Sequence, residues 1–185
     1  MRLCVVLLLG LGALWAPAGA TTALRYDLTT LARTADAIVV GQVTALQSAW
    51  RDGRIVTQVT VSGDEVLKGP RAPRYTVEVL GGTVDGIGQK VAGMAAFEPG
   101  EHVVLFLRAA SGDSTFEVVG LGQGKLRVEV GLSGPALIQD LGELRLVDRA
   151  ADGALTPTQT AARVRVPLND FLHAVREAVA AGPAR

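Results

Sequence analysis

Cysteine and histidine are nearly absent from this chain. Cys4 is the single cysteine among 185 residues, and His102 and His173 are the two histidines. One cysteine cannot form an intrachain disulfide, and structural zinc normally requires four Cys or His ligands. No HExxH pattern occurs either. The sequence therefore predicts no metal, no cofactor, and a fold that packing alone must stabilise.

Excess charge and long apolar runs are also missing. The formal net charge is +0, and the lysines are confined to Lys68, Lys90 and Lys125. Without a basic cluster in the sequence, neither nucleic acid nor anionic lipid is an expected partner. Beyond the first twenty residues, no run approaches the roughly 18 apolar residues of a membrane helix, so no transmembrane segment is expected there.

Residues 1–20 have the pattern of a secretory signal peptide. Arg2 supplies the positive start, Leu3–Ala16 form a short apolar run, and Ala18-Gly19-Ala20 give the small-x-small cleavage pattern. Cleavage after Ala20, with Ala18 and Ala20 in the peptidase subsites, would export the chain to the periplasm or the medium. It would also remove Cys4.

Alternating apolar residues predict strands along most of the remaining chain. Ile55, Thr57 and Val59 share one face, as in a half-buried strand, and Asp52-Gly53 before them is a hairpin signal. Trp50, beside this turn, is expected to cover one end of the fold. Strands are predicted near 37–48, 55–61, 75–79, 103–107, 116–119 and 125–130, with a weaker hairpin over 136–146.

Two helices flank these strands. Leu28, Leu31 and Ala32 predict a short helix over Leu28–Thr34. A one-sided apolar stripe near the C-terminus predicts an amphipathic helix; it consists of Leu168, Phe171, Leu172, Val175 and Val179.

We therefore expect a mainly β fold, built as a small antiparallel barrel with a short N-terminal helix and a C-terminal amphipathic helix. A β-sandwich is the alternative. The expected domains are a signal peptide at 1–20, a barrel domain at 21–147, a polar linker at 148–166 and the helix at 167–182.

The Gly-rich connection from Gly81 to Phe97 is the candidate binding site. Loops this long without secondary structure are uncommon in compact domains unless they are functional. A compact loop that closes one end of the barrel is an equally weighted interpretation. The expected binding residues are Gly81, Gly82, Asp85, Gly86 and Lys90.

Several segments resemble a secreted bacterial family of uncharacterised proteins. They are Ala35–Val43, Asp64–Gly69, Gly81-Gly82, Phe97–Leu107 and Gly120–Lys125, and the resemblance spans about Leu28 to Val130. The first strand more faintly resembles the OB-fold barrel of tissue inhibitors of metalloproteinases and netrin-like modules. This resemblance implies an OB-like barrel. The inhibitory mechanism does not transfer, because those inhibitors chelate zinc through an N-terminal cysteine, whereas the cleaved chain would begin at Thr21 and contain no cysteine.

Three functions remain open from the sequence. The first is an exported, soluble, non-catalytic binding module for a protein or cell-envelope component. The second is a carboxylate-dependent hydrolase that uses Asp85, Glu98 or Glu101. The third is a structural or assembly component that pairs through an exposed sheet edge.

Overall fold

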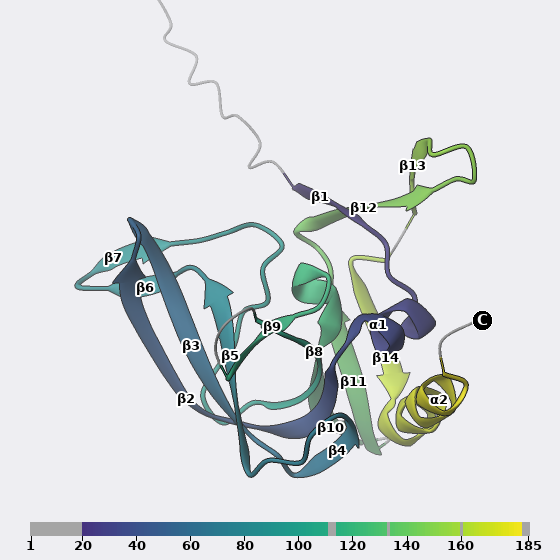
Figure 1. The fold of residues 1–185 in the computed structure, drawn as a ribbon, viewed down its shortest axis with the longest axis horizontal. Coiled ribbons are helices and arrows are strands. Elements are labelled where there is room, and N and C mark those ends of the chain that lie inside the picture. The colour runs from purple at the N-terminus through teal and green to yellow at the C-terminus, as the bar shows by residue number, and fades with distance from the viewer. Residues whose placement is uncertain (1–19, 111–113, 133, 160, 183–185) are drawn as a thin grey trace, which may run out of the picture.

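The computed structural model describes residues 20–110, 114–132, 134–159 and 161–182. This part of the chain is mainly β and contains two helices, one near each end, as the sequence predicts (Figure 1). The predicted signal peptide, including Ala18, lies outside the described residues except for Ala20. No helix in the described ranges is long and apolar enough to cross a membrane.

One large sheet dominates the described residues. Its order is β14 (Arg163–Pro167), β11 (Gly134–Asp140), β10 (Lys125–Gly131), β8 (His102–Ala109), β9 (Thr115–Val118), β5 (Arg74–Leu80), β3 (Arg54–Ser62), β2 (Ala37–Arg51) and β4 (Glu65–Lys68). The free edge of β8 also pairs with β2, so that β2, β3, β5, β9 and β8 form a closed ring (Figure 1). Neighbouring strands of this sheet pair antiparallel, as expected, except that β5 and β9 run parallel. The sheet is therefore mixed.

Strand β2 belongs to two parts of the ring. Residues 37–42 pair with β8, and the strand then pairs with β3 from Val43 to Arg51. At the transition, a Cβ on Gly41 would overlap the carbonyl oxygen of Ser62. Glycine at position 41 thus permits the close approach of two strands.

Strand β8 separates two apolar cores, which explains why residues 103–107 are apolar without alternation. Val103, Leu105 and Leu107 point into the ring. Val104 and Phe106 point to the opposite side, where they pack beneath the two helices. Each residue of this run therefore has an apolar environment.

The helices α1 (Leu28–Thr34) and α2 (Leu168–Ala180) cover the second core. The Asp27 side chain caps α1 by accepting a hydrogen bond from the Thr30 backbone nitrogen at 2.7 Å. In α2, Leu172 and Val175 are buried against this core, while Phe171 packs at its margin and meets Phe106 edge-on. The predicted stripe is the face that docks.

The segment 148–166 differs from the expected linker. It contains the end of β12 (Leu144–Arg149), the short β13 (Leu155–Pro157) and most of β14. Strand β12 also pairs in parallel with β1 (Thr21–Leu24). In β14, Val164 and Val166 are the only apolar side chains before Pro167, so the alternation was too short to be distinguished from a polar linker.

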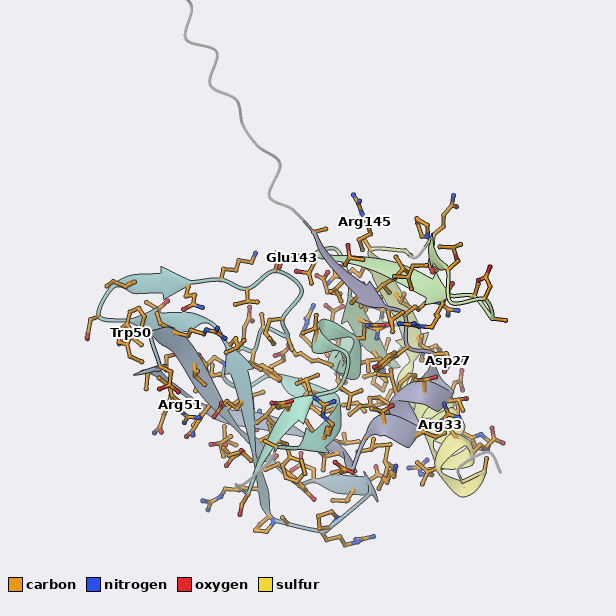
Figure 2. All side chains as sticks on the ribbon, turned by 45° about the horizontal axis from the view of Figure 1, so that its top comes forward. Asp27, Arg33, Trp50, Arg51, Glu143 and Arg145 are labelled. Atoms are coloured by element: carbon orange, nitrogen blue, oxygen red, sulfur yellow. The ribbon has the colours of Figure 1, made fainter. Side chains whose placement is uncertain are left out.

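Trp50 does not cover the end of the ring. It lies near the tip of the long β2–β3 hairpin and is 49% exposed (Figure 2). The last pair of β3 with β5 is Val56 with Leu80, and Trp50 lies one pair further along the hairpin, opposite Ile55.

Candidate functional site

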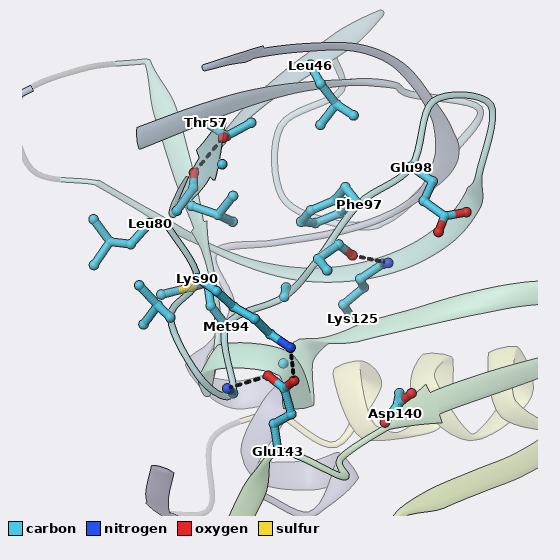
Figure 3. Close-up of a pocket in the computed structure, with 18 of the residues that line it drawn as sticks. Leu46, Thr57, Leu80, Lys90, Met94, Phe97, Glu98, Lys125, Asp140 and Glu143 are labelled. Carbon is cyan, nitrogen blue, oxygen red and sulfur yellow. Dashed lines mark hydrogen bonds and ion pairs between the residues drawn. The ribbon is translucent and has the colours of Figure 1, made fainter. Parts of the chain in front are cut away.

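A cleft of about 710 Å³ lies at one end of the ring (Figure 3). The segment 81–98 forms one wall, and the turn from β11 to β12 forms another. Apolar side chains line the ring side, among them Leu46, Leu80 and Phe97. Charged side chains of β10, including Lys125 and Arg127, line the sheet side.

Three of the five predicted binding residues line this cleft: Gly81, Gly82 and Lys90. Asp85 and Gly86 do not line it. They form the turn between β6 (Gly82–Val84) and β7 (Ile87–Gln89), with φ angles of 51° and 79°. Such positive angles are typical of the Asp-Gly hairpin turn.

The segment 81–97 combines the two interpretations that the sequence leaves open. Its first half is the β6–β7 hairpin, which leaves Ile87 exposed. Its second half packs Met94 and Phe97 against the core inside the ring. The second half therefore closes part of the ring, whereas the hairpin stands at the edge of the cleft.

A small polar contact fixes the start of this segment. Thr57 Oγ1 donates to the Gly81 carbonyl oxygen at 2.6 Å and lies 2.8 Å from Ser48 Oγ. A Cβ on Gly82 would overlap both hydroxyl groups. Close packing against β2 and β3 thus requires Gly82, and the approach of the Gln89 carbonyl oxygen requires Gly81. Packing explains both glycines without a ligand.

Lys90 and Glu143 form an ion pair across the rim of the cleft. Glu143 also accepts a hydrogen bond from the Gly93 backbone nitrogen at 3.4 Å. The Lys90 ammonium, helped by this backbone donor, lowers the pKa of Glu143. Both side chains are solvent-exposed, so the pair contributes little to folding stability.

The most enclosed charges of the cleft belong to Lys125 and Glu101. Lys125 Nζ lies 2.7 Å and 2.8 Å from the two carboxylate oxygens of Glu101. It also donates to the Ala96 carbonyl oxygen and lies 4.7 Å from the centre of the Phe97 ring. Burial lowers the pKa of Lys125, and the hydrogen-bonded Glu101 partly opposes that effect.

Lys125 is the site residue that sequence reasoning missed. One signal was available: it is one of three lysines, and it opens a strand in which Arg127 and Glu129 follow on the same face. The partner Glu101 comes from a turn 24 residues earlier, and only the fold brings the two together.

The carboxylates proposed for hydrolysis do not share one place. Glu98 and Glu101 line the cleft, whereas Asp85 is at the tip of the β6–β7 hairpin. The Glu101 carboxylate is already occupied by Lys125 and by the Glu98 backbone nitrogen, which donates to it at 3.2 Å. Within the described ranges, no three His, Cys, Asp or Glu side chains are grouped to hold a metal ion.

Comparison of the chain with protein-family models, with curated proteins and with solved structures finds no match.

Proposed function

We propose that this protein is an exported, non-catalytic binding module whose cleft takes a segment of a protein partner from the cell envelope. The observation that carries the proposal is the cleft itself. Its volume of about 710 Å³ is within the range of ligand sites, roughly 300–1,000 Å³. Its walls combine apolar surface with charges of both signs, which suits a polypeptide better than a purely apolar or purely charged ligand.

The state of the charged groups favours binding over catalysis. Lys125 is surrounded by the Glu101 carboxylate, the Ala96 carbonyl oxygen and the Phe97 ring. A general acid or base needs free access to a substrate proton, and these contacts occupy the ammonium group. The same contacts hold the wall of the cleft in a fixed shape.

The ring of five strands supports the proposed OB-like barrel. The proposed relation to secreted bacterial proteins rests on the sequence segments that resemble them. Barrels of this kind bind ligands on one strand face and on the adjacent loops. Here the loop 81–98 borders the cleft at the end of the ring. Export and a periplasmic or extracellular location belong to the same proposal.

Affinity capture from an envelope extract of the host bacterium tests the proposal. We compare the wild type with the double variant Lys90→Ala/Glu98→Ala, since both side chains line the cleft and are exposed. The control is Asp85→Asn, which lies outside the cleft and tolerates the positive φ angle. The double variant should lose the partner without a change in melting temperature, and the control should retain it. Capture that survives the double variant would contradict a binding role for the cleft.

A carboxylate-dependent hydrolase is the second candidate. Glu98 favours it, because this exposed carboxylate lines the cleft. Turnover of any substrate in a broad hydrolase panel, abolished by Glu98→Ala, would support this candidate in place of the first.

A further inference from the structure

Six charged side chains from β10, β14 and the turn before β8 form one connected group, which we call the arginine network. They are Glu101, Lys125, Arg127, Glu129, Arg163 and Arg165, joined by ion pairs of 2.6 to 3.6 Å. Strand register explains how they meet. Arg127 lies opposite Ile138, and Ile138 lies opposite Arg165, so that three neighbouring strands present these residues on one face.

Three arginines of the network converge on a single carboxylate. Glu129 lies 2.6 Å from Arg127 and 3.4 Å from both Arg163 and Arg165. These ion pairs place three guanidinium groups around one carboxylate, and Asp140, which lies opposite Arg163 in the sheet, is a second carboxylate nearby. One positive charge therefore remains in local excess, and Glu101 with Lys125 adds none. The chain as a whole has a formal net charge of +0, so this excess is a local feature.

The arginines are accessible to a dissolved ligand. The exposed fractions of their side chains are 37% for Arg127, 58% for Arg163 and 50% for Arg165. Position 131 has no side chain to crowd the arginines: a Cβ on Gly131 would lie 3.2 Å from Arg165 Nη2. Holding three like charges together is unfavourable unless an anion balances them, and Glu129 balances only one.

We propose that Arg127, Arg163 and Arg165 form a binding site for a phosphate dianion, either free or as a monoester. The guanidinium fork matches the oxygens of phosphate, and an anion pairs with the arginines that Glu129 does not balance. Arginines from two strands approach from different directions, which suits a tetrahedral anion better than a second planar carboxylate. Arg127 also lines the cleft, so the site borders it, but the inference does not depend on what the cleft binds.

Calorimetric titration of the full chain with inorganic phosphate at low ionic strength tests this site. Arg163→Gln and Arg165→Gln should each weaken binding about tenfold, the loss of one charged hydrogen-bonding partner. Arg165→Lys should recover only part of the affinity, because it keeps the charge but loses the fork. Glu129→Gln should tighten binding, since it removes the carboxylate that competes for the same arginines.

The pair Arg108–Glu117 supplies matched controls. It is an exposed ion pair at 2.9 Å between β8 and β9, outside the network. Arg108→Gln changes the net charge by the same amount as Arg165→Gln, and Glu117→Gln by the same amount as Glu129→Gln. Both control variants should leave the phosphate affinity unchanged. The proposal would be overturned if the control variants changed phosphate affinity as much as the variants of the network do. Binding of acetate as tight as that of phosphate would also overturn it.

A second titrant distinguishes the two sources of the anion. Binding of phenyl phosphate with the same dependence on Arg165 would assign the site to monoesters, and its exclusion would assign the site to free phosphate. The cleft variant Lys90→Ala/Glu98→Ala should keep its phosphate affinity. Failure of the phosphate site and failure of the proposed partner binding are therefore separate results.

Discussion

The ammonium group of Lys125 lies 2.7 Å from one carboxylate oxygen of Glu101 and 2.8 Å from the other. Their side chains are only 14% and 6% exposed. This pair links β10 to the turn before β8, and its members also reach the segment 96–98 through Ala96 and Glu98. The wall of the cleft therefore depends on an ion pair that is largely removed from water.

Glu101→Gln should lower the free energy of unfolding by about 3 kcal/mol, because it leaves a largely buried ammonium without its counter-charge. Urea denaturation measures the change. The exposed Glu117 gives a matched control, and Glu117→Gln should change stability by less than about 1 kcal/mol. The double variant Glu101→Gln/Lys125→Met should be more stable than Glu101→Gln alone. If the stability losses of the two single variants simply add in the double variant, the two side chains do not interact.

Asp27→Ala should destabilise the protein by about 1 kcal/mol at neutral pH, the usual effect of removing a helix N-cap. The hydrogen bonds from Thr30 lower the pKa of Asp27 below 3.8, its ordinary value. The charged Asp27 side chain therefore stabilises the folded state fully when the pH is above 3.8. This stabilisation is lost as the pH falls through the lowered pKa of the folded state. Thermal melts across the acid range should show the difference between wild type and Asp27→Ala shrinking.

Asp27→Asn is the control for this pH dependence. Asparagine is a good N-cap but does not titrate, so its stability relative to Asp27→Ala should stay nearly constant with pH. A constant difference for the wild type as well would contradict the role of the Asp27 charge.

The docking of α2 is tested by its buried face. Val175 is fully buried, and Val175→Ala should reduce stability by about 2 kcal/mol through lost apolar burial and a residual cavity. Phe171→Ala should reduce it by about 3 kcal/mol, the lower end of the usual range, because Phe171 is only partly buried. His173→Ala, on the exposed face, should leave the denaturation midpoint unchanged.

Two glycines should respond differently to alanine, because they are required for different reasons. Gly41→Ala should cost about 3 kcal/mol, since the new Cβ overlaps backbone atoms of β3. Gly53→Ala should cost about 1 kcal/mol, because its surroundings are open and only its φ of 74° is unfavourable for alanine. Equal effects in a denaturation series would contradict the close approach at Gly41.

Local patterns were sufficient for both helices and for most of the longer strands, but not for β1, β4 (Glu65–Lys68), β13 and β14. Alternation identified β3, the Asp52-Gly53 pair identified its hairpin, and the apolar stripe identified α2 with its buried face. Each of these signals depends on the backbone period or on the conformational preference of neighbouring residues, and so it is present in the sequence itself. The segment 81–97 was identified by the same kind of evidence, since its length and glycine content mark it as unusual.

Tertiary structure alone decided how these elements close and where charges meet. The ring depends on β8 pairing with β2 and on the parallel pair of β5 and β9, and no local pattern specifies partners so far apart in the chain. The same holds for Lys125 with Glu101 and for Arg127 with Arg165, which strand register places side by side. Periodicity is a local property, so the residue pattern is enough to predict a mainly β chain with two helices. The cleft and the arginine network were decided only by folding, because both arise from contacts between strands that are distant in sequence.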